Sequence, residues 1–185
     1  TTVEVIFDTS EETDMAMPHY LQAVPEDNPD FGIIFDASWS VRAEKGIERP
    51  KFTVTRNPVN CVGMWIDQLN TPEGPSNQIP EFAKAVIRGD SAAELAVLAE
   101  SVDVMYSEYP FDDPDYHRAE MTVDFDVASK SLTLQTAVAG AQHGSAPQEN
   151  RSSGANPVVS LANFLAGLVD RGKLASNEIG EMCRF

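Results

Sequence analysis

Acidic side chains follow two apolar segments that have the composition of buried strands. Glu11 and Glu12 lie in the polar run after residues 2–7, and Asp36 directly follows residues 31–35. The carboxyl ends of strands in an open α/β sheet are where ligands bind, so both segments would deliver carboxylates to one edge. One glutamate of such a pair can hold a metal ion while the other takes a proton from the attacking water. The pattern therefore indicates a hydrolytic metal site, with Asp36 as a further oxygen ligand.

Each of these acids also has an ordinary structural interpretation. Paired glutamates on a turn are usually solvated surface residues. Asp36 can equally cap a helix or accept a hydrogen bond within a loop. The spacing alone leaves both interpretations open.

Two polar residues further along the chain are suited to contacting a substrate. His143 lies in a loop between Gly140 and Gly144, where an exposed imidazole can donate a hydrogen bond to a developing oxyanion. Asn77 lies in the run 74–80, and its amide can bind a substrate carbonyl or carboxylate. The alternatives are a solvated loop histidine and an asparagine that forms an Asx-turn before a strand.

The first part of the chain has the pattern of a parallel sheet. Residues 2–7 and 31–35 are apolar without alternation, which is typical of strands buried on both faces. A short helix is predicted over 15–24, with Pro18 in its first turn. The composition changes at residues 47–50, so we expect a hinge there that separates a first domain, 1–48, from a second, 49–185.

Strands with one solvent-exposed face are predicted in the second domain. Residues 51–56 and 82–88 alternate between apolar and polar side chains, and 119–127 with 131–139 form a predicted hairpin. These strands predict one antiparallel sheet of four strands.

Helices are predicted after each pair of strands. Ser91 and Glu94 form a capping box at the start of a helix over 91–109, and Asn156 caps a second helix that ends at Gly172. A further short helix is expected within 174–185. The order β, β, α, β, β, α predicts two helices on a single face of the sheet, and the whole chain is therefore of the α/β class.

The charge and cysteine content exclude several classes of protein. The 185 residues contain 13 Lys and Arg against 29 Asp and Glu, a net charge of −16, so nucleic acids and anionic membrane surfaces would be repelled. No stretch is apolar enough to span a bilayer. Cys61 and Cys183 have no metal-ligand or disulfide-framework spacing, which favours a reduced, cytoplasmic compartment.

Taken in order, these segments resemble the two-zinc metallopeptidases that include the PepV-type dipeptidases, carnosinases and deacylases of amino-acid derivatives. The run Ile-Phe-Asp-Thr-Ser-Glu-Glu-Thr at 6–13 resembles the strand and Glu-Glu pair of this family, and 29–46 resembles the segment that carries the next zinc-binding aspartate. The resemblance implies that Glu11 is the general base and that Glu12 and Asp36 are zinc ligands.

The second domain resembles the lid of the same family. Residues 76–81 are similar to its Asn-x-x-Pro element, which implies that Asn77 contacts the substrate. Residues 141–147 and 154–157 are similar to its Ala-x-His-Gly-x-x-Pro and Gly-x-Asn pattern, which implies that His143 stabilises the tetrahedral intermediate. The chain is thus expected to be an internal piece: the end of a catalytic domain plus the lid domain. The family's His-x-Asp segment, bridging aspartate and C-terminal zinc-binding histidine are not found in this sequence.

The resemblance implies a metal-dependent hydrolase that uses two zinc ions, or other divalent metals, to cleave short peptides or N-acyl amino acids. The leading alternative is a non-catalytic lid module that forms a homodimer through its sheet edge. A third hypothesis is a small-ligand-binding domain whose similarity to the peptidases is accidental.

Overall fold

The computed structural model describes residues 5, 16–25, 54, 61–75, 77–111, 116–140 and 156–184, together with the backbone of 142–143. The chain divides into two compact units. The first comprises Thr1–Arg49 with Pro75–Asn77, and the second comprises Pro50–Gly74 with Gln78–Phe185. Most of the described residues belong to the second unit.

Helix α1 (Met17–Ala23) is the element described in the first unit. Pro18 occupies its first turn, where the missing N–H costs no helical hydrogen bond, as the sequence predicted. The predicted strands over 2–7 and 31–35, and with them the parallel sheet, lie outside the described residues except for Val5. The parallel-sheet part of the fold thus stays a prediction.

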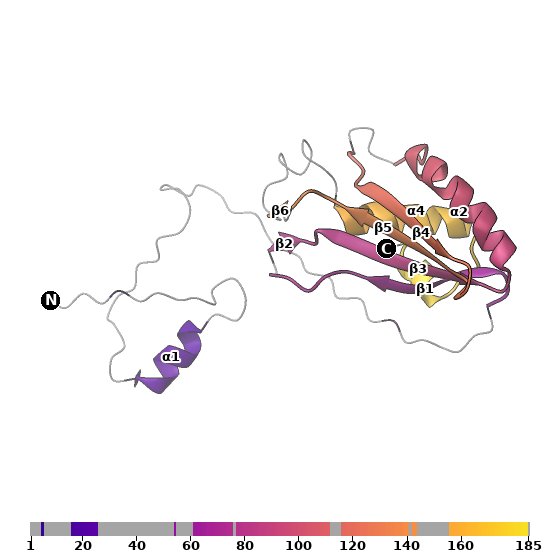
Figure 1. The fold of residues 1–185 in the computed structure, drawn as a ribbon. Helices are drawn as coiled ribbons and strands as arrows, with labels where there is room; N and C mark the ends of the chain where they lie inside the picture. The colour runs from indigo at the N-terminus through magenta and orange to yellow at the C-terminus, as the bar shows by residue number, and fades with distance from the viewer. Residues whose placement is uncertain are drawn as a thin grey trace. The chain divides into compact units, whose positions relative to one another are not determined.

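The second unit contains a four-stranded antiparallel sheet, as predicted (Figure 1). Its strand order is β1 (Met64–Asn70), β3 (Phe82–Gly89), β5 (Ser131–Ala137), β4 (Glu120–Asp126). Strands β4 and β5 form the expected hairpin, whose turn is closed by Lys130 N donating to Val127 O at 3.4 Å. Lys130 itself has φ of +49°.

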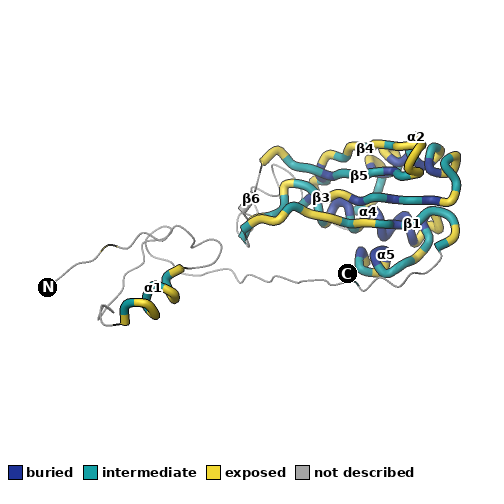
Figure 2. Tube along the Cα trace, turned by 60° about the horizontal axis from the view of Figure 1, so that its bottom comes forward, coloured by how far each residue is buried: buried dark blue, intermediate teal, exposed yellow. Residues whose placement is uncertain are grey.

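One face of this sheet forms the core. The register sets Ala85 opposite Leu134, and Leu134 opposite Val123, so apolar side chains from three strands lie on the same face. Ala85 and Leu134 are fully buried, whereas alternate residues of β4 and β5 are exposed or half-buried. The burial along the tube alternates accordingly in Figure 2. This alternation is the signature of a sheet covered on one face only.

Helices α2 (Ala92–Ser107) and α4 (Pro157–Asp170) cover that face. The predicted caps are present: Ser91 Oγ accepts from Glu94 N at 3.3 Å, and Asn156 Oδ1 accepts from Val158 N at 3.0 Å. The Phe164 ring of α4 meets the Tyr106 ring of α2 edge to face, with 5.2 Å between centroids. The helices therefore share one apolar core with the sheet.

Strand β1 was not predicted from the sequence. Its pairing with β3 shifts register between Ile66 and Gln68, which leaves Asp67 as a bulge and breaks the two-residue alternation. The strand that was predicted nearby, over 51–56, lies outside the described residues except for Val54, which packs against the core.

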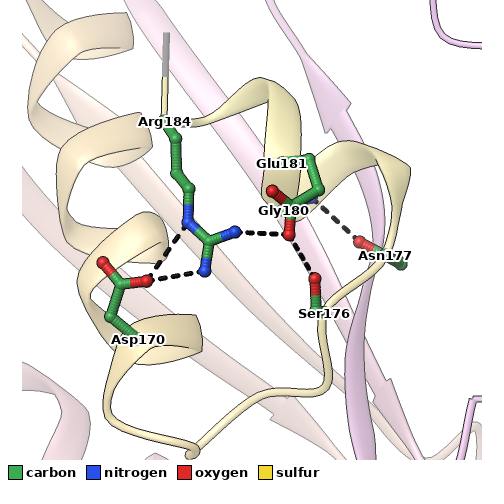
Figure 3. Close-up of polar contacts among 6 residues, drawn as sticks. All are labelled: Asp170, Ser176, Asn177, Gly180, Glu181 and Arg184. Carbon is green, nitrogen blue, oxygen red and sulfur yellow. Dashed lines mark hydrogen bonds and ion pairs between the residues drawn. The ribbon is translucent and has the colours of Figure 1, made fainter.

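The C-terminal segment covers the outer side of β1. Ala175 N donates to Met64 O at 2.6 Å, and Asn177 Nδ2 donates to Ile66 O at 2.7 Å. Helix α5 (Glu178–Met182) follows, and Asn177 Oδ1 accepts from Gly180 N at 2.9 Å in its first turn. Figure 3 shows Arg184 joining this helix to α4, with Nη2 2.6 Å from Asp170 Oδ1. The short C-terminal helix expected from the sequence is thereby fixed against the sheet.

Within the described residues, no helix is both long and apolar enough to cross a membrane.

Candidate functional site

The predicted site residues fall into two groups. Glu11, Glu12 and Asp36 lie outside the described residues. Asn77 is described and is half-buried, and the backbone of His143 is described in strand β6. The structure therefore describes the part of the candidate site that contains Asn77 and the backbone of His143.

A two-stranded ladder carries the His143 element. Strand β2 (Gln78–Ile79) pairs antiparallel with β6 (Gln142–His143), so that Gln78 stands opposite His143 and Ile79 opposite Gln142. Gln78 directly follows Asn77 in the chain. The backbone pairing thus brings His143 beside the residue that follows Asn77, although the two motifs are far apart in sequence.

The ladder is a continuation of the two central strands of the sheet. Pro80 and Glu81 connect β2 to β3, and Val138 N donates to Glu81 O at 3.0 Å between the sheet and the ladder. Gly140 has φ of +91°, and its N–H donates to Val138 O at 3.0 Å, which turns the chain from β5 toward β6. Glycine adopts this positive φ without steric cost. In Figure 1, β2 and β6 lie at the end of the sheet where β3 begins.

Helix α4 starts near the same end of the sheet. Thr136, near the end of β5, is fully buried and its Oγ1 donates to Pro157 O at 2.7 Å. Asn156 is the asparagine of the Gly-x-Asn pattern at 154–157. Its side chain caps α4, and its carbonyl oxygen accepts a hydrogen bond from Tyr116 OH at 3.2 Å. Asn156 therefore has a structural role in fixing the loop-to-helix junction.

Sequence reasoning missed the role of Thr136. Its position is on the buried side of the β5 alternation, where Leu132 and Leu134 precede it. A hydroxyl at a core position is the signal that could have identified it, because a buried polar group needs a partner.

A second group of polar contacts surrounds Ser160, in the first turn of α4. Ser160 Oγ lies 2.8 Å from Tyr116 OH and accepts from Ala119 N at 3.1 Å. Tyr106 OH donates to Ala119 O at 2.7 Å. Burial raises the pKa of Tyr106 to about 12 and raises the pKa of Tyr116 as well. Both phenols are therefore neutral hydrogen-bonding groups at physiological pH.

Two further histidines and a cysteine are also described. His19 and His117 are exposed. Cys183 is buried, and burial raises the pKa of its thiol to about 11. Among the residues that the structure describes, no three His, Cys, Asp or Glu side chains are grouped to hold a metal ion. The zinc prediction thus rests on Glu12 and Asp36.

Neither a protein-family model nor a curated protein matches this sequence.

Proposed function

We propose that this chain carries the lid and part of the metal site of a dipeptidase-type hydrolase, which cleaves short peptides or N-acyl amino acids. The observation that carries the proposal is the β2–β6 ladder. It joins the two lid motifs in which a substrate contact, Asn77, and an oxyanion donor, His143, were predicted.

The roles of the residues follow from their chemistry. Zinc, when bound, supplies a water of lowered pKa. Glu12 and Asp36 would hold the metal, and Glu11 would accept a proton from the attacking water and pass it to the leaving amine. His143 would donate to the oxyanion, and Asn77 would orient a carbonyl or carboxylate of the substrate.

The surrounding fold supports a positioning role for the His143 element. Its strand extends from a sheet whose buried face is packed against two helices, and α4 is tied to β5 by the hydrogen bond from Thr136 to Pro157. Sites on such rigid elements hold a catalytic group more accurately than sites on free loops.

Zinc binding by the full 185-residue chain tests the metal site. Calorimetry should detect binding that is lost in Asp36→Ala and kept in Asp67→Ala, a carboxylate at the bulge of β1. Hydrolysis of simple dipeptides should be followed in the same samples. Equal affinities in the wild type and Asp36→Ala would remove Asp36 from the metal site.

His143 requires a test that separates catalysis from metal binding. His143→Ala should reduce turnover about 100-fold or more, the usual effect of losing one oxyanion donor, while zinc affinity changes little. His117→Ala, an exposed histidine in the same unit, is the matched control. Binding of a phosphinate dipeptide analogue, whose tetrahedral oxygens resemble the oxyanion, should weaken in His143→Ala only. A parallel loss of zinc would make His143 a ligand instead.

The alternative, a non-catalytic interaction module, is supported by strand β4, which forms one outer edge of the sheet. Such a module should self-associate equally with and without zinc, whereas the hydrolase proposal requires metal binding. Sedimentation velocity with zinc and with a chelator distinguishes the two.

A further inference from the structure

The two edges of the four-stranded sheet differ in how they are covered. The outer side of β1 receives hydrogen bonds from Ala175 N and Asn177 Nδ2. Strand β4 pairs with β5, and no other described strand lies on its outer side. An edge strand presents unpaired N–H and C=O groups that can accept an added strand. The edge at β4 is therefore the one suited to a further strand.

The side chains of β4 alternate in charge as well as in burial. Glu120, Thr122, Asp124 and Asp126 are exposed on the open face of the sheet, whereas Met121, Val123 and Phe125 are half-buried on the face covered by the helices. Asp126 is engaged in the hairpin turn, where it accepts from Ala128 N at 2.9 Å and Ser129 Oγ at 2.6 Å.

Glu120 and Asp124 face uncharged residues across the β4–β5 hairpin. The register sets Glu120 opposite Ala137 and Asp124 opposite Thr133. The salt bridges among the described residues join Arg88 to Asp67, and Arg184 to Asp170 and Glu181. As far as the described residues go, the carboxylates of Glu120 and Asp124 are thus open to a cation that approaches from the outer side.

We propose that the β4 edge binds an extended segment of another protein in which Lys or Arg alternates with apolar residues. The segment would add a fifth strand. Its basic side chains would lie beside Glu120 and Asp124 on the open face, and its apolar side chains would lie beside Met121, Val123 and Phe125. Opposite charges and apolar pairs on neighbouring strands stabilise a sheet by about 0.2–1 kcal/mol each. This inference does not depend on the hydrolase proposal.

A second copy of this chain is a poorer match for the same edge. Antiparallel pairing of two β4 strands about Val123 would set Glu120 opposite Asp126 and Thr122 opposite Asp124. Like charges directly opposite each other destabilise a strand pair. The net charge of −16 on each copy adds to that repulsion.

Three short peptides test the proposal on the full 185-residue chain. The first is Lys-Val-Lys-Val-Lys-Val-Lys, the second replaces each Lys by Glu, and the third has the composition of the first in blocks, Lys-Lys-Lys-Lys-Val-Val-Val. Calorimetry should show the alternating basic peptide binding at least about tenfold more tightly than the other two. Amide exchange should slow in β4 when this peptide binds, because its outward N–H groups become paired.

Charge-reversal variants distinguish binding at the β4 edge from nonspecific attraction to the net negative charge of the chain. Glu120→Lys with Asp124→Lys should weaken the basic peptide at least about tenfold and allow the Glu-Val peptide to bind. Glu73→Lys with Glu100→Lys makes the same change in net charge at exposed positions outside β4 and should have less than about a threefold effect. Binding of the Glu-Val peptide by the Glu120→Lys, Asp124→Lys variant would also demonstrate that this variant is folded.

Three results would overturn the proposal. Equal weakening in both double variants would mean that only the overall negative charge attracts the peptide. Equal binding of the alternating and block peptides would exclude an added strand. Dimers of the peptide-free chain with protected β4 amides would make a second copy the occupant of the edge.

Discussion

At the scale of single residues, Ser160 connects parts of the second unit that are distant in sequence. Its hydroxyl is fully buried in α4 and contacts Ala119 N and Tyr116 OH, just before β4. The sequence places Ser160 beside the apolar stripe of this helix but gives no sign of its partners. Their positions depend on how the hairpin packs against the helix.

Replacing Ser160 by Ala should destabilise the fold. The change leaves the buried N–H of Ala119 without its partner, and an unsatisfied buried donor costs about 1–3 kcal/mol. The free energy of unfolding from urea titration measures the loss. Ser107→Ala is the control, because Ser107 is an exposed helical serine. A loss equal to the control's would mean that the Ser160 contacts contribute nothing net.

Tyr106 should make the protein sensitive to alkali. Its folded pKa is raised from the usual 10.0 to about 12 by burial, so between these values the unfolded chain loses the phenolic proton while the folded chain retains it. The unfolded state then binds fewer protons, and stability falls as the pH rises. Urea midpoints from pH 8 to about pH 11.5 should fall more steeply in the wild type than in Tyr106→Phe. Parallel curves would assign the pH dependence to other groups, with Cys183 and Tyr116 the first candidates because burial raises the pKa of both.

At the scale of elements, local signals predicted most of the second unit. The helices α2 and α4 have caps and apolar stripes within one segment, and the β4–β5 hairpin has clean alternation. Strand β1 was missed because its bulge at Asp67 breaks the period. Strands β2 and β6 have two residues each, too few to carry any period. The sequence could therefore name Asn77 and His143 but not the ladder that pairs their elements.

Asn177 should contribute more to stability than an ordinary cap. Its Oδ1 accepts from Gly180 N in α5, and its Nδ2 donates to Ile66 O of β1. Asn177→Ala loses both bonds, whereas Asn177→Asp keeps the acceptor and loses the donor. We expect losses of about 1–3 kcal/mol for each, larger for Ala, because a cap alone contributes about 1 kcal/mol.

Urea titration of both variants checks the Asn177 prediction. Asn163→Ala is the control, because Asn163 Nδ2 donates to Val159 O of its own helix at an exposed position. Full stability of Asn177→Asp would show that the bond to Ile66 O contributes nothing and that the cap alone matters.

At the scale of the whole molecule, the net charge of −16 opposes the compact state. The positive charges of the described second unit are partly engaged in contacts of their own. Arg88 pairs with Asp67 and donates to Ser129 O, and Arg184 pairs with Asp170 and Glu181. Acidic side chains, 29 against 13 Lys and Arg, outnumber the cations that could pair with them, so the chain repels itself. Salt at about 0.15 M shortens the Debye length to about 8 Å and screens this repulsion.

The melting temperature should accordingly rise with ionic strength. We expect an increase of several degrees between about 0.01 M and 0.15 M NaCl, since about 1 kcal/mol shifts the midpoint of a domain of this size by about 2–4 °C. MgCl2 at the same ionic strength, measured with and without a chelator, separates screening from site binding. Equal curves in the two salts would assign the effect to screening. A larger rise with Mg²⁺ that Asp36→Ala abolishes would instead assign part of it to the carboxylates of the proposed metal site, and a flat response to both salts would contradict the repulsion argument.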